Sequence, residues 1–136
     1  MLVDDATFRR LCRARDLLAA GYHEPIPLDR AAREACLSPF HFQRTFARVF
    51  GETPHDFLTR LRMDRARRLL AAGDLPVTEI CFEVGYRSVG TFSSRFASLT
   101  GQSPTDFRRE ARRFIAPARG WHALYIPQCF VNFWLA

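Results

Sequence analysis

Apolar residues recur at helical spacing through most of the first 114 residues, and Gly or Pro interrupts the pattern between segments. Ser38, Thr53 and Ser103 each precede a Pro, which marks a helix start because the hydroxyl caps the helix and Pro fits its first turn. Gly closes most of the segments. The pattern predicts seven helices, over residues 5–20, 28–36, 38–50, 54–72, 76–84, 88–101 and 103–114.

No convincing strand precedes residue 115, so the fold class is predicted to be all-α. Each helix has an apolar stripe, which we assign to the core. The stripes place inward Phe8, Leu11, Cys12, Leu18 and Ala19, then Leu28, Ala31, Ala32 and Ala35, then Phe42, Phe46 and Val49, and finally Phe92, Phe96 and Leu99.

The chain contains an internal repeat with a shift of 50 residues. Eight of the positions 38–57 are identical to their counterparts at 88–107. The matched residues are helix caps, turn glycines and inward phenylalanines, which one supersecondary unit would need twice. They are Ser38, Phe42, Phe46, Ala47, Gly51, Pro54, Asp56 and Phe57, matched by Ser88, Phe92, Phe96, Ala97, Gly101, Pro104, Asp106 and Phe107.

The repeated order is a short helix, a tight turn and a capped second helix, which is the plan of a helix-turn-helix unit. The chain is therefore predicted to contain two homeodomain-like helix-turn-helix subdomains, at residues 5–53 and 74–114, joined by a long helix at 54–72. Together they make one DNA-binding domain over residues 1–114. Residues 115–136 form an apolar extension.

Acidic residues are missing from both capped helices. No Asp or Glu lies between Glu34 and Glu52, a window of 17 residues, or between Glu83 and Asp106, a window of 22. Whole-chain charge points the same way, because the formal net charge is +6, the pI is about 9.9 and all 20 basic residues are Arg. Such surfaces suit nucleic acid first and an anionic membrane second.

The outward face of the first capped helix carries side chains that can read bases. Gln43 can bind adenine and Arg44 can bind guanine, each through two hydrogen bonds. Phe40 and Ala47 can touch a thymine methyl group. The alternative is an ordinary solvated helix face, but an exposed Phe beside Gln and Arg on an acid-free helix favours DNA.

The second capped helix has weaker reading chemistry. Its outward residues are Val89, Gly90, Thr91, Ser93 and Ser94, whose hydroxyls make weak base contacts or bind phosphate. We expect this half to supply more affinity than specificity. The residues predicted to hold phosphates are Ser38, Arg48, Arg87, Ser88 and Arg95.

Other function classes have little support in the sequence. The four His and four Cys residues lack metal-ligand spacing, and no nucleophile–base pair or phosphate-binding Gly loop appears, so we expect no enzyme activity, metal or cofactor. The cysteines are interpreted as buried, reduced thiols of a cytoplasmic protein. No signal peptide or membrane span is recognised.

The segments LDRAAREACLSPFHFQRTFARVFGETPHDFLTRLRMDRARRLL and VTEICFEVGYRSVGTFSSRFASLTGQSPTDFRRE resemble the DNA-binding domain of the AraC/XylS family of bacterial transcription regulators. The resemblance covers residues 5 to about 114. It implies two subdomains bridged by the helix at 54–72, with both capped helices in adjacent major grooves about one turn apart. It also implies a transcription activator that recruits RNA polymerase.

The resemblance places Phe40, Gln43, Arg44 and Ala47 where the first recognition helix reads bases, and Val89, Gly90, Thr91, Ser93 and Ser94 on the matching face of the second. This chain has Ser94 where the family often has Arg, and Arg95 follows one position later. Cys81 occupies a core position where the family usually has Ala. The usual large effector domain is not in this sequence, which resembles short stand-alone members or a fragment of a longer regulator.

Residues 115–136 belong to neither repeat. They carry one charge, Arg119, and five aromatic residues, and short strands are expected at 123–126 and 129–135. Three roles stay open for this tail: packing on its own domain, contact with a second copy or a partner, and a small-ligand site. A helical protein-interaction adaptor that works through this tail is the alternative to DNA binding.

Overall fold

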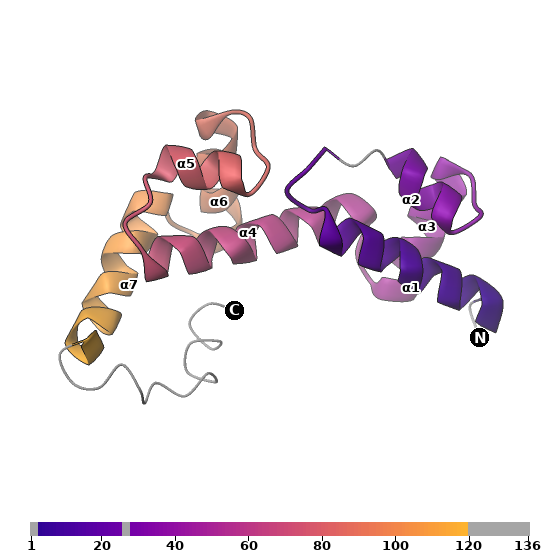
Figure 1. The fold of residues 1–136 in the computed structure, drawn as a ribbon, viewed down its shortest axis with the longest axis horizontal. Coiled ribbons are helices and arrows are strands. Elements are labelled where there is room, and N and C mark those ends of the chain that lie inside the picture. Colours follow the sequence, from indigo (N-terminus) through magenta and orange to yellow (C-terminus); the bar gives the residue numbers. More distant parts are fainter. Residues whose placement is uncertain (1–2, 26–27, 120–136) are drawn as a thin grey trace. The chain divides into compact units, whose positions relative to one another are not determined.

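In a computed structural model, the structure describes residues 3–25 and 28–119, which form seven helices and no strand. The predicted all-α class is confirmed. The helices are α1 (Asp5–Ala20), α2 (Leu28–Glu34), α3 (Pro39–Phe50), α4 (Pro54–Ala72), α5 (Val77–Glu83), α6 (Val89–Thr100) and α7 (Pro104–Arg119), as labelled in Figure 1.

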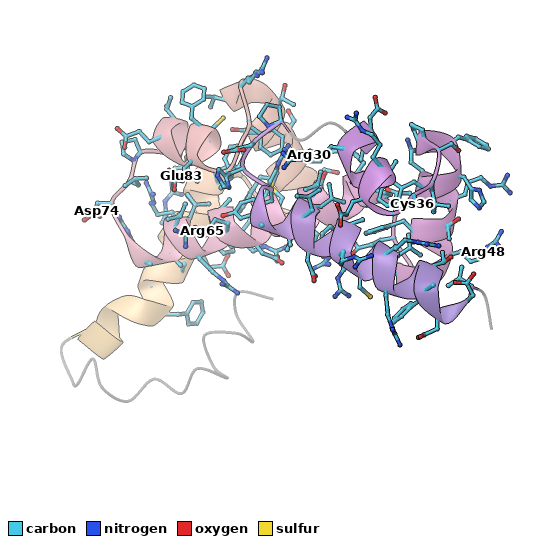
Figure 2. The ribbon with its side chains drawn as sticks, turned by 45° about the vertical axis from the view of Figure 1, so that its right-hand side comes forward. Arg30, Cys36, Arg48, Arg65, Asp74 and Glu83 are labelled. Atoms are coloured by element: carbon cyan, nitrogen blue, oxygen red, sulfur yellow. The ribbon has the colours of Figure 1, made fainter. Side chains whose placement is uncertain are left out.

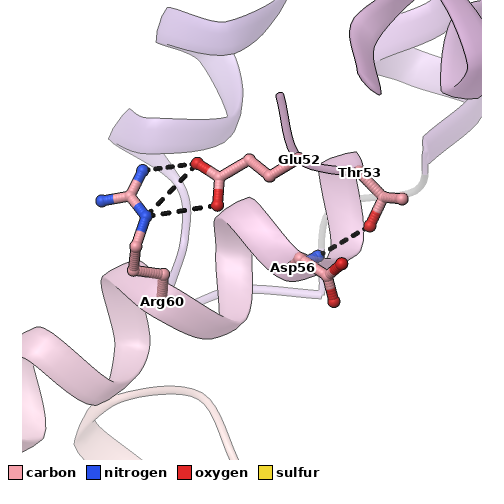
Figure 3. Close-up of polar contacts among 4 residues, drawn as sticks. All are labelled: Glu52, Thr53, Asp56 and Arg60. Carbon is pink, nitrogen blue, oxygen red and sulfur yellow. Dashed lines mark hydrogen bonds and ion pairs between the residues drawn. The ribbon is translucent and has the colours of Figure 1, made fainter. Parts of the chain in front are cut away.

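Hydroxyl caps start four of these helices, as the sequence predicts. The backbone N–H three residues further on donates to each hydroxyl, at 3.3 Å for Ser38 and Ser88 and at 3.1 Å for Thr53 and Ser103. The cap of α4 is visible in Figure 3. Each bond satisfies an N–H group that has no partner within its helix.

The two capped helices also end alike. Gly51 and Gly101 close α3 and α6 with φ of 80° and 83°. Their N–H groups donate to the carbonyls of Ala47 and Ala97 at 2.9 and 2.8 Å. Both glycines are required by this left-handed conformation, in which a side chain would be strained.

The chain forms two compact units whose boundary lies inside α4, at Arg62–Met63. The first half of α4 thus completes the first unit, and its second half belongs to the second. Each unit has its own core. The first core comprises Leu11, Ala14, Leu18, Ala31, Ala32, Ala35, Phe42, Phe46, Phe57 and Leu58, and the second comprises Met63, Ala66, Leu70, Ile80, Cys81, Val84, Phe92 and Phe96.

The second half of α4 takes the place in its unit that α1 has in the first. Three core residues of α1 recur in α4 with identical spacing, which extends the internal repeat beyond the capped helices. They are Leu11, Ala14 and Leu18, matched by Met63, Ala66 and Leu70. Each unit therefore consists of an opening helix, a short helix, a capped helix and a closing helix.

Phenylalanine rings in edge-to-face or tilted contact join each capped helix to its closing helix. The Phe46 ring lies 5.6 Å from that of Phe42 and 5.8 Å from that of Phe57. In the second unit, Phe96 lies 5.9 Å from Phe92 and 5.5 Å from Phe107. Phe42 and Phe46 of α3, and Phe92 and Phe96 of α6, are completely buried. Aromatic pairs at these separations add to the stabilisation from burial.

The end of α2 corrects the sequence prediction. The helix stops at Glu34, because Cys36 takes a left-handed conformation with φ of 57°. The N–H groups of Cys36 and Leu37 donate back to Arg33 and Ala32, both at 3.0 Å, which is a Schellman cap. Cys36 is consequently exposed, so the prediction that it is buried was wrong.

The other described cysteines differ from Cys36. Cys81 is completely buried in the second core, and this burial raises the pKa of its thiol. Cys12 is half-buried on α1. Cys81 therefore behaves as a small apolar core residue, as its place in the sequence indicated.

One further boundary and one burial differ from the prediction. α7 continues to Arg119, five residues past its expected end. Leu99, predicted to face the core, is 50% exposed.

The two units differ at the end of the capped helix. In the first unit, the ring centres of Phe8 on α1 and Phe50 on α3 lie 6.5 Å apart. The position of α4 that matches Phe8 is Arg60, which binds Glu52 (Figure 3). The end of α6 therefore lacks the aromatic contact found at the end of α3. The strands expected at 123–126 and 129–135 lie outside the described residues.

Candidate nucleic-acid interface

The exposed side of α3 carries the side chains that the sequence assigned to base reading. Phe42 and Phe46 are buried, and they fix the helix so that the opposite side faces solvent. Phe40 is 70% exposed, which is unusual for so large an apolar side chain. Gln43, Arg44 and Arg48 are also exposed, and Ala47 is half-buried.

Phe40 and Arg44 contact each other one turn apart on this surface. The Arg44 guanidinium carbon lies 5.5 Å from the centre of the Phe40 ring. A guanidinium over a ring face is held by the ring quadrupole, so the long Arg side chain has a preferred direction. This pair was not predicted from the sequence, although an aromatic residue four positions before an Arg on a helix is a usable signal.

The electrostatic surroundings of α3 favour an anionic ligand. Neither α3 nor α6 contains a carboxylate. Several arginines elsewhere in the described residues pair with a carboxylate, for example Arg9 with Asp5 and Arg60 with Glu52, both at 2.6 Å. In contrast, Arg44 and Arg48 form no ion pair with any described residue, and Arg48 lies at the surface of the first unit (Figure 2).

The corresponding side of α6 is exposed but chemically simpler. Gly90, Thr91, Ser94 and Arg95 are exposed. Val89, which the sequence placed outward, is half-buried and packs against the second core. Ser93 is half-buried. This face offers hydroxyls and one guanidinium, so it has fewer groups that can distinguish bases than α3 has.

Gly90 is not required by the packing of α6. A Cβ atom built on it would meet only the Ser88 hydroxyl, at 3.8 Å, which is an ordinary contact. Its absence of a side chain therefore leaves the start of α6 open to the close approach of a ligand.

The turn before the capped helix is one residue longer in the second unit. Cys36 and Gly85 hold equivalent left-handed positions, with φ of 57° and 96°. The cap Ser38 follows two residues after Cys36, whereas the cap Ser88 follows three residues after Gly85. The additional residue is Arg87, which is exposed at the start of α6. Ser38 and Ser88 are exposed too, and their hydroxyl protons stay free to donate to phosphate.

Two exposed polar residues on the capped helices were missing from the predicted interface. His41 follows Phe40 on α3, and Ser98 lies on the last turn of α6. Both could be placed at the surface from the helical period, but neither residue type by itself indicated a base contact. The structure adds them to the surfaces that a ligand of α3 or α6 can reach.

Other classes of site are not supported by the described residues. Within residues 3–25 and 28–119, no three His, Cys, Asp or Glu side chains form a group that could hold a metal ion. No helix among them is long and apolar enough to cross a membrane.

Comparisons with known proteins agree with this geometry. A family model described as a helix-turn-helix domain matches residues 31–110, which span α2 to the start of α7. The transcriptional activator RhaS of Yersinia pestis is 32% identical over 108 residues, which cover 79% of this chain and 40% of RhaS. A regulator from Chromobacterium violaceum described as AraC-type has a TM-score of 0.69 and 26% identity, and the match covers 79% of this chain and 96% of that one. The chain belongs to the AraC/XylS family.

A second solved structure bears on the ligand of this AraC/XylS domain. The DNA-binding domain of the transcription factor AdpA, determined in complex with a target DNA, is 28% identical with a TM-score of 0.71. The match covers 76% of this chain and 93% of that domain. The chain is thus a DNA-binding domain of a family of transcription regulators and not an enzyme. It spans less than half the length of the curated relatives that it matches.

Proposed function

We propose that this chain regulates transcription in the bacterial cytoplasm by binding promoter DNA in a sequence-specific manner, with α3 and α6 in adjacent major grooves. The observation that carries the proposal is the exposed, acid-free surface of α3, where Phe40, Gln43, Arg44 and Arg48 lie together. This surface combines groups that read bases with a guanidinium for phosphate.

The two capped helices have unequal roles in this proposal. α3 reads sequence, because Gln43 and Arg44 can each form two hydrogen bonds to a base edge and Ala47 lies one turn further on. α6 anchors the complex: Thr91, Ser93 and Ser94 supply hydroxyls and Gly90 permits close approach. Val89 contributes at most a small apolar contact, since it is half-buried.

Phosphate contacts are assigned to the exposed polar residues around each capped helix. Arg48, Arg87 and Arg95 would bind as guanidinium groups, and Ser38 and Ser88 would donate through their hydroxyls. These contacts fix the position of the protein on the duplex without reading its sequence.

Replacement of Arg44 by Ala tests the reading surface. The variant should bind a selected duplex more weakly by about 1–3 kcal/mol and lose its preference at one base pair. Arg9→Ala is the matched control, because Arg9 is exposed on α1 and paired with Asp5. Equal affinity and equal specificity of Arg44→Ala and the unaltered protein would show that α3 is not the reading helix.

Transcription activation through RNA polymerase is the expected outcome of DNA binding. The support is the membership of the family and the similarity to RhaS, which is described as an activator. A reporter promoter that carries the selected site should give more transcript with purified polymerase and this protein than with polymerase alone. Reduced transcript would make the protein a repressor. A contact of residues 115–136 with a second copy or another protein stays a prediction.

A further inference from the structure

We infer that Phe40 and Arg44 act as one composite reader of a guanine that stands next to a methylated pyrimidine, either thymine or 5-methylcytosine. The inference rests on the proposed function and names the base step that α3 recognises. Its starting point is the contact between the two side chains, 5.5 Å from guanidinium carbon to ring centre.

Phe40 has no structural role that explains its position. It is 70% exposed, whereas the neighbouring Phe42 on the same helix is completely buried. An exposed ring of this size loses the stabilisation that burial would give. The Phe40 ring contacts the Arg44 guanidinium, so it can influence how that guanidinium is presented at the surface.

The geometry of guanine recognition then places the ring. A guanidinium that donates to both O6 and N7 of a guanine lies in the plane of that base. Base pairs follow one another about 3.4 Å apart along the duplex. The Phe40 ring centre lies 5.5 Å from that guanidinium carbon, which is more than one base step, so the ring can reach the major-groove edge of a neighbouring base pair.

The chemistry of the ring selects what that neighbouring edge presents. A phenyl ring forms no strong hydrogen bond, so it leaves a cytosine amino group or a guanine carbonyl without a partner. It packs favourably on the C5-methyl group of thymine, the apolar feature of the major groove. The same methyl group occurs on 5-methylcytosine, so the ring cannot distinguish the two by this contact.

Arg44 and Phe40 depend on each other in this arrangement. The ring restricts the guanidinium to one direction, and the bound guanidinium in turn fixes the height of the ring. Removal of either residue should therefore weaken the discrimination made by the other. Arg44→Lys should not restore it, because an ammonium group lacks the planar fork that binds O6 and N7 together.

The test uses the full chain and a fluorescent duplex taken from selection for binding. Each thymine adjacent to the guanine that Arg44 reads is replaced by deoxyuridine, which removes only the methyl group. We expect about fourfold weaker binding at one of these positions, the factor for one buried methyl group. A 5-methylcytosine pair at that position should bind about fourfold more tightly than an unmethylated cytosine pair.

Variants separate the composite reader from a general loss of binding. Phe40→Ala should bind the thymine and deoxyuridine duplexes equally, while Arg9→Ala, altered at an exposed position of α1 that pairs with Asp5, should keep the difference. Circular dichroism before titration confirms that each variant is helical. The inference is overturned if the unaltered protein binds both duplexes equally, or if the selected site has no thymine beside that guanine. Sequence-specific binding would still stand in either case. Absence of any selected sequence contradicts the proposed function itself.

Discussion

Arg62 of α4 donates a hydrogen bond from Nε to the carbonyl oxygen of Tyr22, 2.6 Å away and 40 residues earlier in the chain. The same guanidinium reaches the carbonyl of Glu24 at 3.4 Å. At the equivalent place in the second unit, Arg112 donates to the carbonyl of Gly73 at 3.2 Å and pairs with Asp74. An arginine of the closing helix thus holds the loop after the opening helix in both units.

We predict that Arg62→Ala lowers the free energy of unfolding by about 1–3 kcal/mol. The charged donor satisfies carbonyl groups just beyond α1, and its loss leaves them without that partner. Urea unfolding followed by circular dichroism measures the change. Arg65→Ala, an exposed position on the same helix, should stay within about 0.5 kcal/mol of the unaltered protein. Equal stability of both variants would show that the loop does not depend on Arg62.

We predict that Cys36→Gly raises stability by about 0.5–1 kcal/mol. Cys36 is held at φ of 57°, where a side chain costs about 1–2 kcal/mol, and glycine avoids that cost at the expense of more backbone entropy. Gly85 occupies the equivalent place at φ of 96°, so Gly85→Ala should destabilise the protein by a similar amount. Thermal unfolding of both variants checks the pair, and a fall in stability of Cys36→Gly contradicts the assigned cap.

Phe40 is exposed and Phe46 is buried on the same helix, so the same substitution should have very different effects on stability. Phe46→Ala should cost about 3–5 kcal/mol of stability, because it opens a cavity in the first core. Phe40→Ala should change stability by no more than about 0.5 kcal/mol, because its ring is at the surface. Urea unfolding measures both changes. A large loss of stability in Phe40→Ala would assign its ring to the core.

Arg48 should contribute to the salt dependence of DNA binding. Each phosphate contact on duplex DNA adds about 0.9 to the slope of log affinity against log salt concentration. Arg48→Ala should therefore reduce the slope by about one and weaken all sequences to a similar extent. Arg15→Ala on α1, beside Asp16 at 3.3 Å, should leave the slope unchanged. An unchanged slope in Arg48→Ala removes this residue from the phosphate contacts.

Most of the fold could be predicted from sequence because its signals are local. Ser38 and Ser88 as caps, Gly51 and Gly101 as ends, and the repeated phenylalanines each act within one or two helical turns. The early end of α2 was missed because a cysteine in a left-handed position gives no such signal. Its counterpart in the second unit, Gly85, is the residue that indicates a left-handed turn at this position of the repeat.

Long-range contacts explain the other differences. Leu99 has the right helical phase for burial, yet its unit lacks a counterpart of the contact between Phe8 and Phe50. Neither that contact nor the bond from Arg62 to Tyr22 follows from periodicity, since the first joins two helices and the second joins α4 to the loop after α1. For the candidate site, periodicity correctly placed Arg44 and its neighbours on an exposed face, but which of them touch bases depends on the DNA.

Selection of bound sequences from random duplex DNA is the most direct test of binding by two unequal units. We predict two short enriched blocks about ten base pairs apart, one for each capped helix. The stronger block should contain a guanine that Arg44→Ala no longer selects. A single block would contradict the role of α6 in binding, and no enrichment at all would contradict sequence-specific recognition by this chain.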